Sequence, residues 1–246
     1  MKKILYFDCF AGISGDMTIG ALLDLGIDQQ QFLLQLEKLN IKDYQIEIKK
    51  GLKKGISGTD FNVVLQHQHH HHHHEHRNLH DIEHIIEDST LEDSIKDMSK
   101  RIFRLVAEAE AKIHGKPIEE VHFHEVGAID SIVDIVGTAI CIQLLGVDEV
   151  YASPLHMGSG FVECAHGIIP VPAPATLEIV KGVPIYNEGI KSELVTPTGA
   201  AIIKTLSSTF GDIPAMEVES IGYGLGKREL AIPNMLRVYL GIKKNR

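Results

Sequence analysis

The sequence has no Trp, and only 6% of its 246 residues are aromatic, so it offers no stacking platform for nucleic-acid bases. Lys and Arg are outnumbered, at 24 against 33 Asp and Glu. The resulting formal net charge of -9 argues against a broad nucleic-acid-binding face. Three Cys and no CxxC pair are too few for a disulfide framework, which favours a reducing, cytoplasmic location.

Long apolar runs are also missing. The apolar segment at residues 4–7 ends at Asp8, which is too early for the core of a signal peptide. The longest apolar stretch, residues 135–147, is interrupted by Gly137 and Gln143 and falls short of the roughly 20 residues of a membrane-spanning helix. We therefore expect a buried helix there and no membrane partner.

Histidine is the residue type in excess. The chain has 15 His, and ten of them lie between His67 and His84. Neutral imidazole binds copper, nickel and zinc, so this segment suits the capture of a borderline metal; an inert spacer or a cloning tag are the alternatives. The predicted ligands form one consecutive run: His69, His70, His71, His72, His73 and His74.

Periodicity predicts an α/β fold, with a mixed sheet flanked by helices and a disordered His-rich loop inserted at about residues 66–80. We expect a single domain over residues 1–246. The predicted strands cover residues 4–10, 44–50, 61–65, 121–125, 149–152, 161–162 and 235–240. The predicted helices cover residues 17–25, 28–39, 82–113, 129–145, 176–181 and 196–206. Residues 170–174 are expected to be extended, and residues 222–227 to form a glycine-rich loop.

Two histidines and three acids form the second candidate metal site. His122 and His124 share one face of a predicted strand, and Asp130 and Asp134 lie one turn apart on the predicted helix that follows. With Glu125, they offer two imidazoles and three carboxylates to one metal ion. The alternative is structural, with Asp130 at a helix N-terminus and Asp134 bonded to nearby backbone.

Three small-residue loops are candidate anion sites. Residues 10–16 join a strand to a helix and include Gly12, Ser14, Gly15 and Asp16, where free backbone N–H groups favour an anion. Residues 196–199, with Thr196 and Thr198, begin another helix, and residues 222–228 combine glycines with two cations. Each loop alone is more often a plain turn or cap.

A fourth segment, residues 158–167, holds Ser159, Cys164 and His166. A catalytic thiol needs a depressed pKa and a paired base, and the sequence shows neither. A buried Cys beside a turn His explains the pair equally well.

Together these segments resemble one family, the nickel-insertion proteins of nickel-pincer cofactor biosynthesis, which serve lactate racemase maturation. The resemblance covers essentially the whole chain and rests on six blocks: FDCFAGISGDM at residues 7–17, HFHEVGAIDSIVD at 122–134, GSGF at 158–161, HG at 166–167, PVPAPAT at 170–176 and ELVTPTGA at 193–200.

The resemblance implies an enzyme, a nickel insertase of the lyase (cyclometallase) type. Its substrate would be pyridinium-3,5-bisthiocarboxylic acid mononucleotide, in which carbon–nickel and nickel–sulfur bonds form with hydrolysis of CTP and with Mn or Mg. The family usually continues into a C-terminal nucleotide-binding domain, which is sometimes encoded separately. We expect this chain to correspond to the N-terminal part, with that domain absent and acting as a separate partner. Whether the chain acts without that partner and whether it forms a homo-oligomer are open.

The resemblance and the residues together give the site roles. Asp130, Asp134 and Glu125 are the predicted catalytic residues, with His122 and His124 as metal ligands. Gly12, Ser14, Gly15, Asp16, Ser159, Thr196 and Thr198 are the predicted walls for the mononucleotide, and the His run would deliver nickel. Two other functions stay open: a nickel store or chaperone without chemistry, and a metal-dependent phosphate-ester hydrolase.

Overall fold

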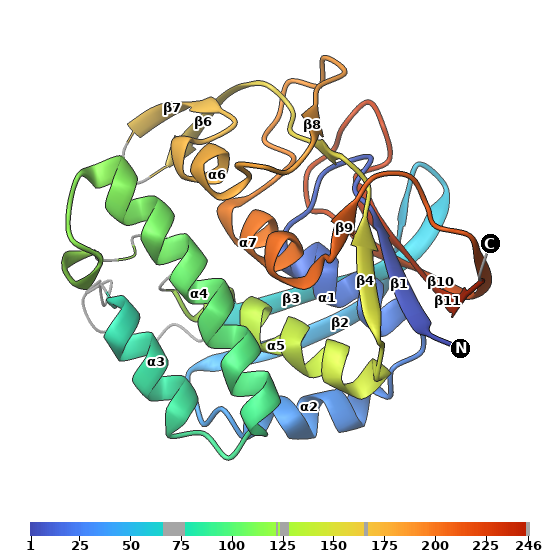
Figure 1. The fold of residues 1–246 in the computed structure, drawn as a ribbon, viewed down its shortest axis with the longest axis horizontal. Helices are drawn as coiled ribbons and strands as arrows, with labels where there is room; N and C mark the ends of the chain where they lie inside the picture. Colours follow the sequence, from blue (N-terminus) through green and yellow to red (C-terminus); the bar gives the residue numbers. More distant parts are fainter. Residues whose placement is uncertain (66–76, 122, 124–127, 165–166, 245–246) are drawn as a thin grey trace.

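The computed structural model describes residues 1–65, 77–121, 123, 128–164 and 167–244 (Figure 1). Its helices are α1 (Gly15–Asp24), α2 (Gln29–Glu37), α3 (Leu79–Glu87), α4 (Asp93–His114), the short 3-10 helix η1 (Ile118–Glu120), α5 (Ile129–Leu145), α6 (Pro174–Ile179) and α7 (Pro197–Leu206). Its strands are β1 (Lys3–Asp8), β2 (Tyr44–Lys53), β3 (Ile56–Leu65), β4 (Glu149–Ala152), β5 (Leu155–His156), β6 (Gly160–Cys164), β7 (Gly167–Val171), β8 (Ile185–Tyr186), β9 (Thr209–Phe210), β10 (Met216–Leu225) and β11 (Met235–Lys243).

Seven strands form one mixed sheet in the order β2-β3-β10-β11-β1-β4-β9. Strand β1 pairs antiparallel with β11 and parallel with β4, and β10 is antiparallel to β11 and parallel to β3. The described residues also contain two small sheets, β5-β8 and β6-β7. The predicted mixed α/β sheet is confirmed.

The helices gather on one side of this sheet (Figure 1). Helix α1 packs on β3, β10 and β11, α5 packs on α1 and β3, and α7 packs on α1 and β4. Helix α4 lies over α5, α6 and α7 as an outer layer. This arrangement brings the first turns of α1, α5 and α7 to one place.

Helix α5 confirms the prediction for the longest apolar run. It buries Ile132, Val136 and Ile140, and it ends at Gly146 in the left-handed conformation with φ 58°. Helix α4 ends in the same way at Gly115, with φ 61°. None of the helices in the described ranges combines the length and apolarity needed to cross a membrane.

The predicted glycine-rich loop at residues 222–227 is wrong over most of its length, because Gly222 to Leu225 belong to strand β10. A Cβ at Gly222 would lie 2.1 Å from the Ala21 carbonyl oxygen, and one at Gly224 would lie 1.8 Å from the Met17 carbonyl oxygen. These glycines therefore allow the strand to run directly beneath α1. Turn structure begins only after Leu225.

Two shorter predictions also change. The expected extended segment at residues 170–174 ends earlier, because Pro174 already begins α6. Val121 and Phe123 lie outside any strand, and the rest of the predicted strand at 121–125 lies outside the described residues. The predicted His-rich loop insertion also lies outside them, apart from residues 77–80.

Candidate functional site

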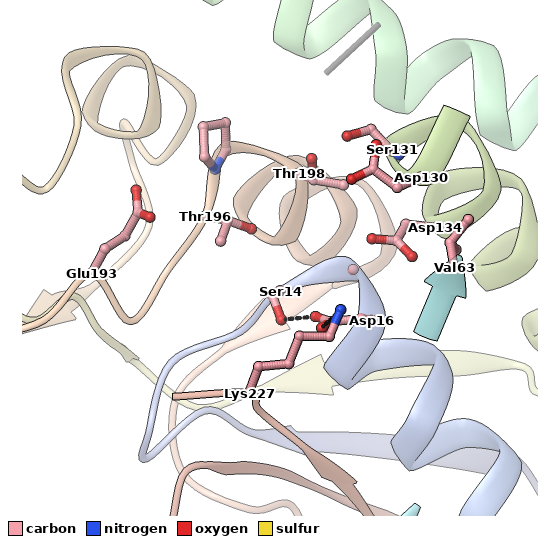
Figure 2. Close-up of a pocket in the computed structure, with 12 residues that line it drawn as sticks. Ser14, Asp16, Val63, Asp130, Ser131, Asp134, Glu193, Thr196, Thr198 and Lys227 are labelled. Atoms are coloured by element: carbon pink, nitrogen blue, oxygen red, sulfur yellow. Dashed lines mark hydrogen bonds and ion pairs between the residues drawn. The ribbon is translucent and has the colours of Figure 1, made fainter. Parts of the chain in front are cut away.

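A pocket of about 280 Å³ lies where the N-terminal ends of α1, α5 and α7 meet (Figure 2). It is lined by Ser14, Gly15, Asp16, Val63, Asp130, Ser131, Asp134, Glu193, Thr196, Pro197, Thr198 and Lys227. Its described walls thus combine carboxylates, hydroxyls, helix N-termini and one lysine.

The loop before α1 is held against the segment before α7. The backbone N–H of Ile13 donates to the Leu194 carbonyl at 2.9 Å, and the N–H of Thr196 donates to the Ile13 carbonyl at 3.1 Å. Gly12 has φ +84°, and a Cβ there would lie 2.0 Å from the Leu194 carbonyl oxygen. At Gly199, a Cβ would lie 2.2 Å from the Ile13 carbonyl oxygen. Glycine is therefore required on both sides of the contact that joins the two helix starts.

A buried histidine supports the same loop from behind. His156 Nδ1 lies 2.7 Å from the Phe10 carbonyl oxygen, and the backbone N–H of Glu188 donates to His156 Nε2 at 3.1 Å. Because Nε2 accepts, Nδ1 carries the hydrogen and donates to Phe10. The ring also stacks on Tyr186, with centroids 4.8 Å apart. His156 was not predicted, because nothing in the local pattern marks a His as buried.

The first turn of α1 touches α5 through a glycine. A Cβ at Gly15 would lie 2.5 Å from both Cβ and Oδ2 of Asp134. The absence of a side chain at residue 15 therefore lets the Asp134 carboxylate approach the start of α1.

Asp16 organises the floor of the pocket. Its Oδ1 accepts hydrogen bonds from the Ser14 hydroxyl and from the backbone N–H of Met17, the latter at 2.9 Å. Its Oδ2 lies 3.3 Å from the Nζ atom of Lys227. Figure 2 shows the two side chains next to each other. This ion pair joins the first turn of α1 to the turn after β10.

Asp134 has the most perturbed environment of these carboxyls. Its Oδ1 atom is shielded from solvent, and no described group donates a hydrogen bond to it. Burial raises the pKa of Asp134 well above its ordinary value, and the negative charges of Asp16 and Asp130 raise it further. Lys227 and the backbone N–H of Asp16 act in the opposite direction.

Three helix N-termini supply positive potential to the same pocket. Ser14 and Ala128, which precede α1 and α5, make no side-chain cap hydrogen bond, and both helices carry an Asp in the first turn. Thr196 caps α7 by accepting from the Gly199 N–H at 3.1 Å, and Pro197 follows it. Helix starts favour bound anions, while the carboxylates favour a cation, so the pocket suits a ligand that carries both.

The structure brings most of the predicted site residues together. The pocket is lined by Ser14, Gly15, Asp16, Asp130, Asp134, Thr196 and Thr198. Gly12 shapes the loop behind it, whereas Ser159 donates its hydroxyl to the Ile190 carbonyl at 3.0 Å and does not line it. Glu193 and Ser131 were not predicted as site residues, although both lie in blocks that carried the resemblance.

The structure does not test the predicted histidine ligands. His122, His124, Glu125 and the run His69 to His74 fall outside the described residues. Within the described ranges, no group of three His, Cys, Asp or Glu side chains is arranged to hold a metal ion. Phe123 lies between two of the predicted ligands in sequence, and its backbone N–H donates to the Arg77 carbonyl at 3.0 Å.

Comparison with known proteins gives a consistent result. Residues 5–246 match the family described as nickel insertion protein. A protein of Acetivibrio thermocellus named pyridinium-3,5-bisthiocarboxylic acid mononucleotide nickel insertion protein is 55% identical over 99% of this chain. A protein of the same name from Clostridium kluyveri is 55% identical over 97%. No solved structure matches the chain.

The match covers only part of each relative. The chain spans 61% of the length of the Acetivibrio thermocellus protein and 62% of that from Clostridium kluyveri.

Proposed function

The chain belongs to the nickel insertion protein family, and from this premise we propose that it takes part in inserting nickel into pyridinium-3,5-bisthiocarboxylic acid mononucleotide. The observation that supports this proposal is the convergence of Asp16, Asp130 and Asp134 with three helix N-termini on one pocket. A metal-insertion site must hold a cation and an anionic substrate at once, and these two kinds of group serve those two needs.

The anionic groups of the mononucleotide are proposed to lie at the starts of α1 and α7. Ser14, Gly15, Thr196 and Thr198 border the pocket there. Backbone N–H groups at a helix start bind phosphate or carboxylate well. Lys227 adds a positive charge that is more than half exposed and so can reach a bound anion.

Nickel is proposed to be held on the α5 side of the pocket. Asp130 is exposed and Asp16 borders the same space, so both can offer oxygen ligands. His122, His124 and Glu125 remain the proposed partners of these acids, and imidazole suits nickel. The Arg77–Phe123 hydrogen bond joins residue 123 to the residue that follows the His-rich segment, which is the proposed source of the ion.

Asp134 is proposed to take up the proton. Forming a carbon–nickel bond at a ring C–H position releases one proton, which a nearby base must accept. A carboxyl whose pKa is raised by burial is a better base than an exposed one, and Asp134 has this property. Nickel–sulfur bonds form from the two thiocarboxylates without a further proton acceptor, provided that both are already ionised.

The dependence on CTP and on Mn or Mg is a separate part of the proposal. It is an implication of the family resemblance, as is a C-terminal nucleotide-binding part that would act with this chain. The C-terminal part is therefore a separate component of the maturation assay.

An in vitro maturation assay tests the proposal. The chain, nickel, CTP, Mn and the mononucleotide would be mixed with and without the C-terminal part of a relative, and lactate racemase activation would be measured. We expect activation with wild type and its loss in Asp130→Asn and Asp134→Asn. Glu217→Gln, at a surface ion pair with Lys244, is the matched control and should retain activity.

Two outcomes would contradict the proposal. If the Asn variants activate as well as wild type, the pocket is not the insertion site. If the chain takes up nickel but no cofactor forms under any combination, storage without chemistry is the better function.

A further inference from the structure

Helix α3 carries two histidines outside the pocket, one turn apart on its outward side. Leu79, Ile82 and Ile86 bury the other side of the helix. His80 and His84 are both exposed, and their ring centroids lie 6.5 Å apart at an interplanar angle of 77°. Positions i and i+4 on a helix are neighbours, so this spacing places two imidazoles where one ion can bridge them.

A carboxylate already orients one of the two rings. His84 Nδ1 lies 2.9 Å from Asp88 Oδ2, again at a spacing of four residues. In the neutral ring, Nδ1 then carries the hydrogen and Nε2 keeps its lone pair. A His that donates one N–H to a carboxylate and presents its other nitrogen is the arrangement seen at metal-bound histidines.

The other carboxylates of α3 have partners away from these rings. Asp81 accepts from the Asn78 N–H in the capping box, Glu83 lies 3.9 Å from Arg104, and Glu87 pairs with Lys100. Among the described residues, Asp88 is thus the acid whose contact with this histidine pair is seen.

We propose that His80 and His84 form a two-imidazole site for a borderline divalent cation, with Asp88 as the positioning residue for His84. Imidazole ligands select nickel, copper or zinc over magnesium and manganese. Two protein ligands leave the remaining positions to water, so the ion can leave readily. We propose that the ion is nickel and that the site holds it only transiently. Only the identity of the metal rests on the proposed function.

Its position in the chain fits such a role. The His-rich segment ends at His76 in the sequence, and α3 begins at Leu79. The helix lies at the outer edge of the molecule, where a bound ion is accessible (Figure 1).

The test measures nickel binding on the full chain after replacing the eight histidines of residues 67–76 by Gln, which removes competing ligands. Nickel affinity would be read by competition with a chromogenic chelator. We expect His80→Gln and His84→Gln each to weaken one bound equivalent by at least about tenfold, and Asp88→Asn to weaken it less. His114→Gln is the matched control, because His114 lies on helix α4 with Glu110, not a second His, one turn before it.

A second readout reports on the helix itself. An ion that bridges positions 80 and 84 stabilises one turn of α3 against local unfolding. Nickel should therefore slow amide hydrogen exchange in α3 of the chain without the histidines of residues 67–76, and should not slow it in the His84→Gln variant of that chain. Magnesium should have no such effect. The site would be overturned if the His80→Gln and His84→Gln variants bind nickel as tightly as the parent chain, or if α3 exchange does not respond to nickel.

This experiment is independent of the maturation assay. It contains neither the mononucleotide nor CTP, so failure of cofactor formation leaves its result unchanged. Conversely, loss of nickel binding at α3 leaves the role of the pocket intact.

Discussion

Burial raises the pKa of Asp134, whereas neighbouring lysines lower the pKa of surface carboxyls such as Glu87 and Glu149. Asp134 lies on α5 against the first turn of α1, and two other acids face it. An arrangement that gathers negative charge and shields it from water is unfavourable for folding, and a bound cation would relieve it.

Because of this residue, the free energy of unfolding of the protein should decrease as the pH rises. The folded state binds the Asp134 proton more tightly than the unfolded state, so the penalty is absent below the ordinary pKa of 3.8. It develops as the pH rises from there through the raised pKa of the folded state, and it persists above it. Each tenfold difference in proton affinity corresponds to about 1.4 kcal/mol.

Asp134→Asn should remove this dependence. In urea unfolding between pH 4 and pH 8, we expect the free energy of unfolding of the variant to rise relative to wild type as the pH increases. The quantity to compare is the slope of the free energy of unfolding against pH. An amide also changes local hydrogen bonding, so the difference at a single pH does not isolate the effect of the charge. Parallel pH profiles for the two proteins would mean that Asp134 is not perturbed.

Gly15→Ala tests the contact between α1 and α5. The new Cβ would lie 2.5 Å from the Asp134 Cβ, so either the helix start or the carboxylate must move. We expect a loss of about 1–3 kcal/mol in the free energy of unfolding, measured by chemical denaturation. Gly51→Ala is the control, because its Cβ would meet only the flexible end of Leu225 at 2.9 Å; an equal loss in both variants would contradict the argument.

At the scale of elements, the starts of α1, α5 and α7 are the parts that make the pocket. The sequence predicted where a helix begins or ends when one residue type at that position has a local effect. Thr196 with Pro197 predicted the start of α7, and Gly115 predicted the end of α4. Strand β10 was not predictable in this way, because Gly222 and Gly224 are explained by α1, which is distant in sequence.

The cap of α7 gives a test at this scale. Thr196→Ala removes the hydroxyl that accepts from the Gly199 N–H, and we expect a loss of about 1 kcal/mol in the free energy of unfolding. Thr196→Ser keeps the acceptor and should stay close to wild type in the same denaturation measurement. If Ser loses as much as Ala, the methyl group of Thr196 matters and the cap does not.

At the scale of the whole molecule, the pocket unites residues from Ser14 to Lys227. The sequence predicted most of its members, because acids and small residues at helix starts are visible locally. It could not predict that Lys227 faces Asp16 or that Ser159 lies away from the pocket, since both depend on how distant segments pack. The fold class needed only the alternation of strands and helices.

The sheet predicts a gradient of protection across the molecule. Strand β1 lies between β11 and β4, and its Ile4, Leu5 and Phe7 side chains are 0% exposed. We expect native-state hydrogen exchange, followed by mass spectrometry, to be slowest in β1 and fastest in the edge strands β2 and β9. Protection of β2 equal to that of β1 would show that the sheet opens as one unit.

The contact of Asp16 with Lys227 has a consequence for the order of events during synthesis. A ribosome makes the chain from its N-terminus, so Asp16 emerges long before the lysine that faces it. The histidines at 67–76 also emerge before that lysine. A growing chain therefore contains these imidazoles before it can form the ion pair between Asp16 and Lys227 at the pocket. Under the proposed function, the histidines that would capture nickel are therefore made before the pocket that would use it is complete.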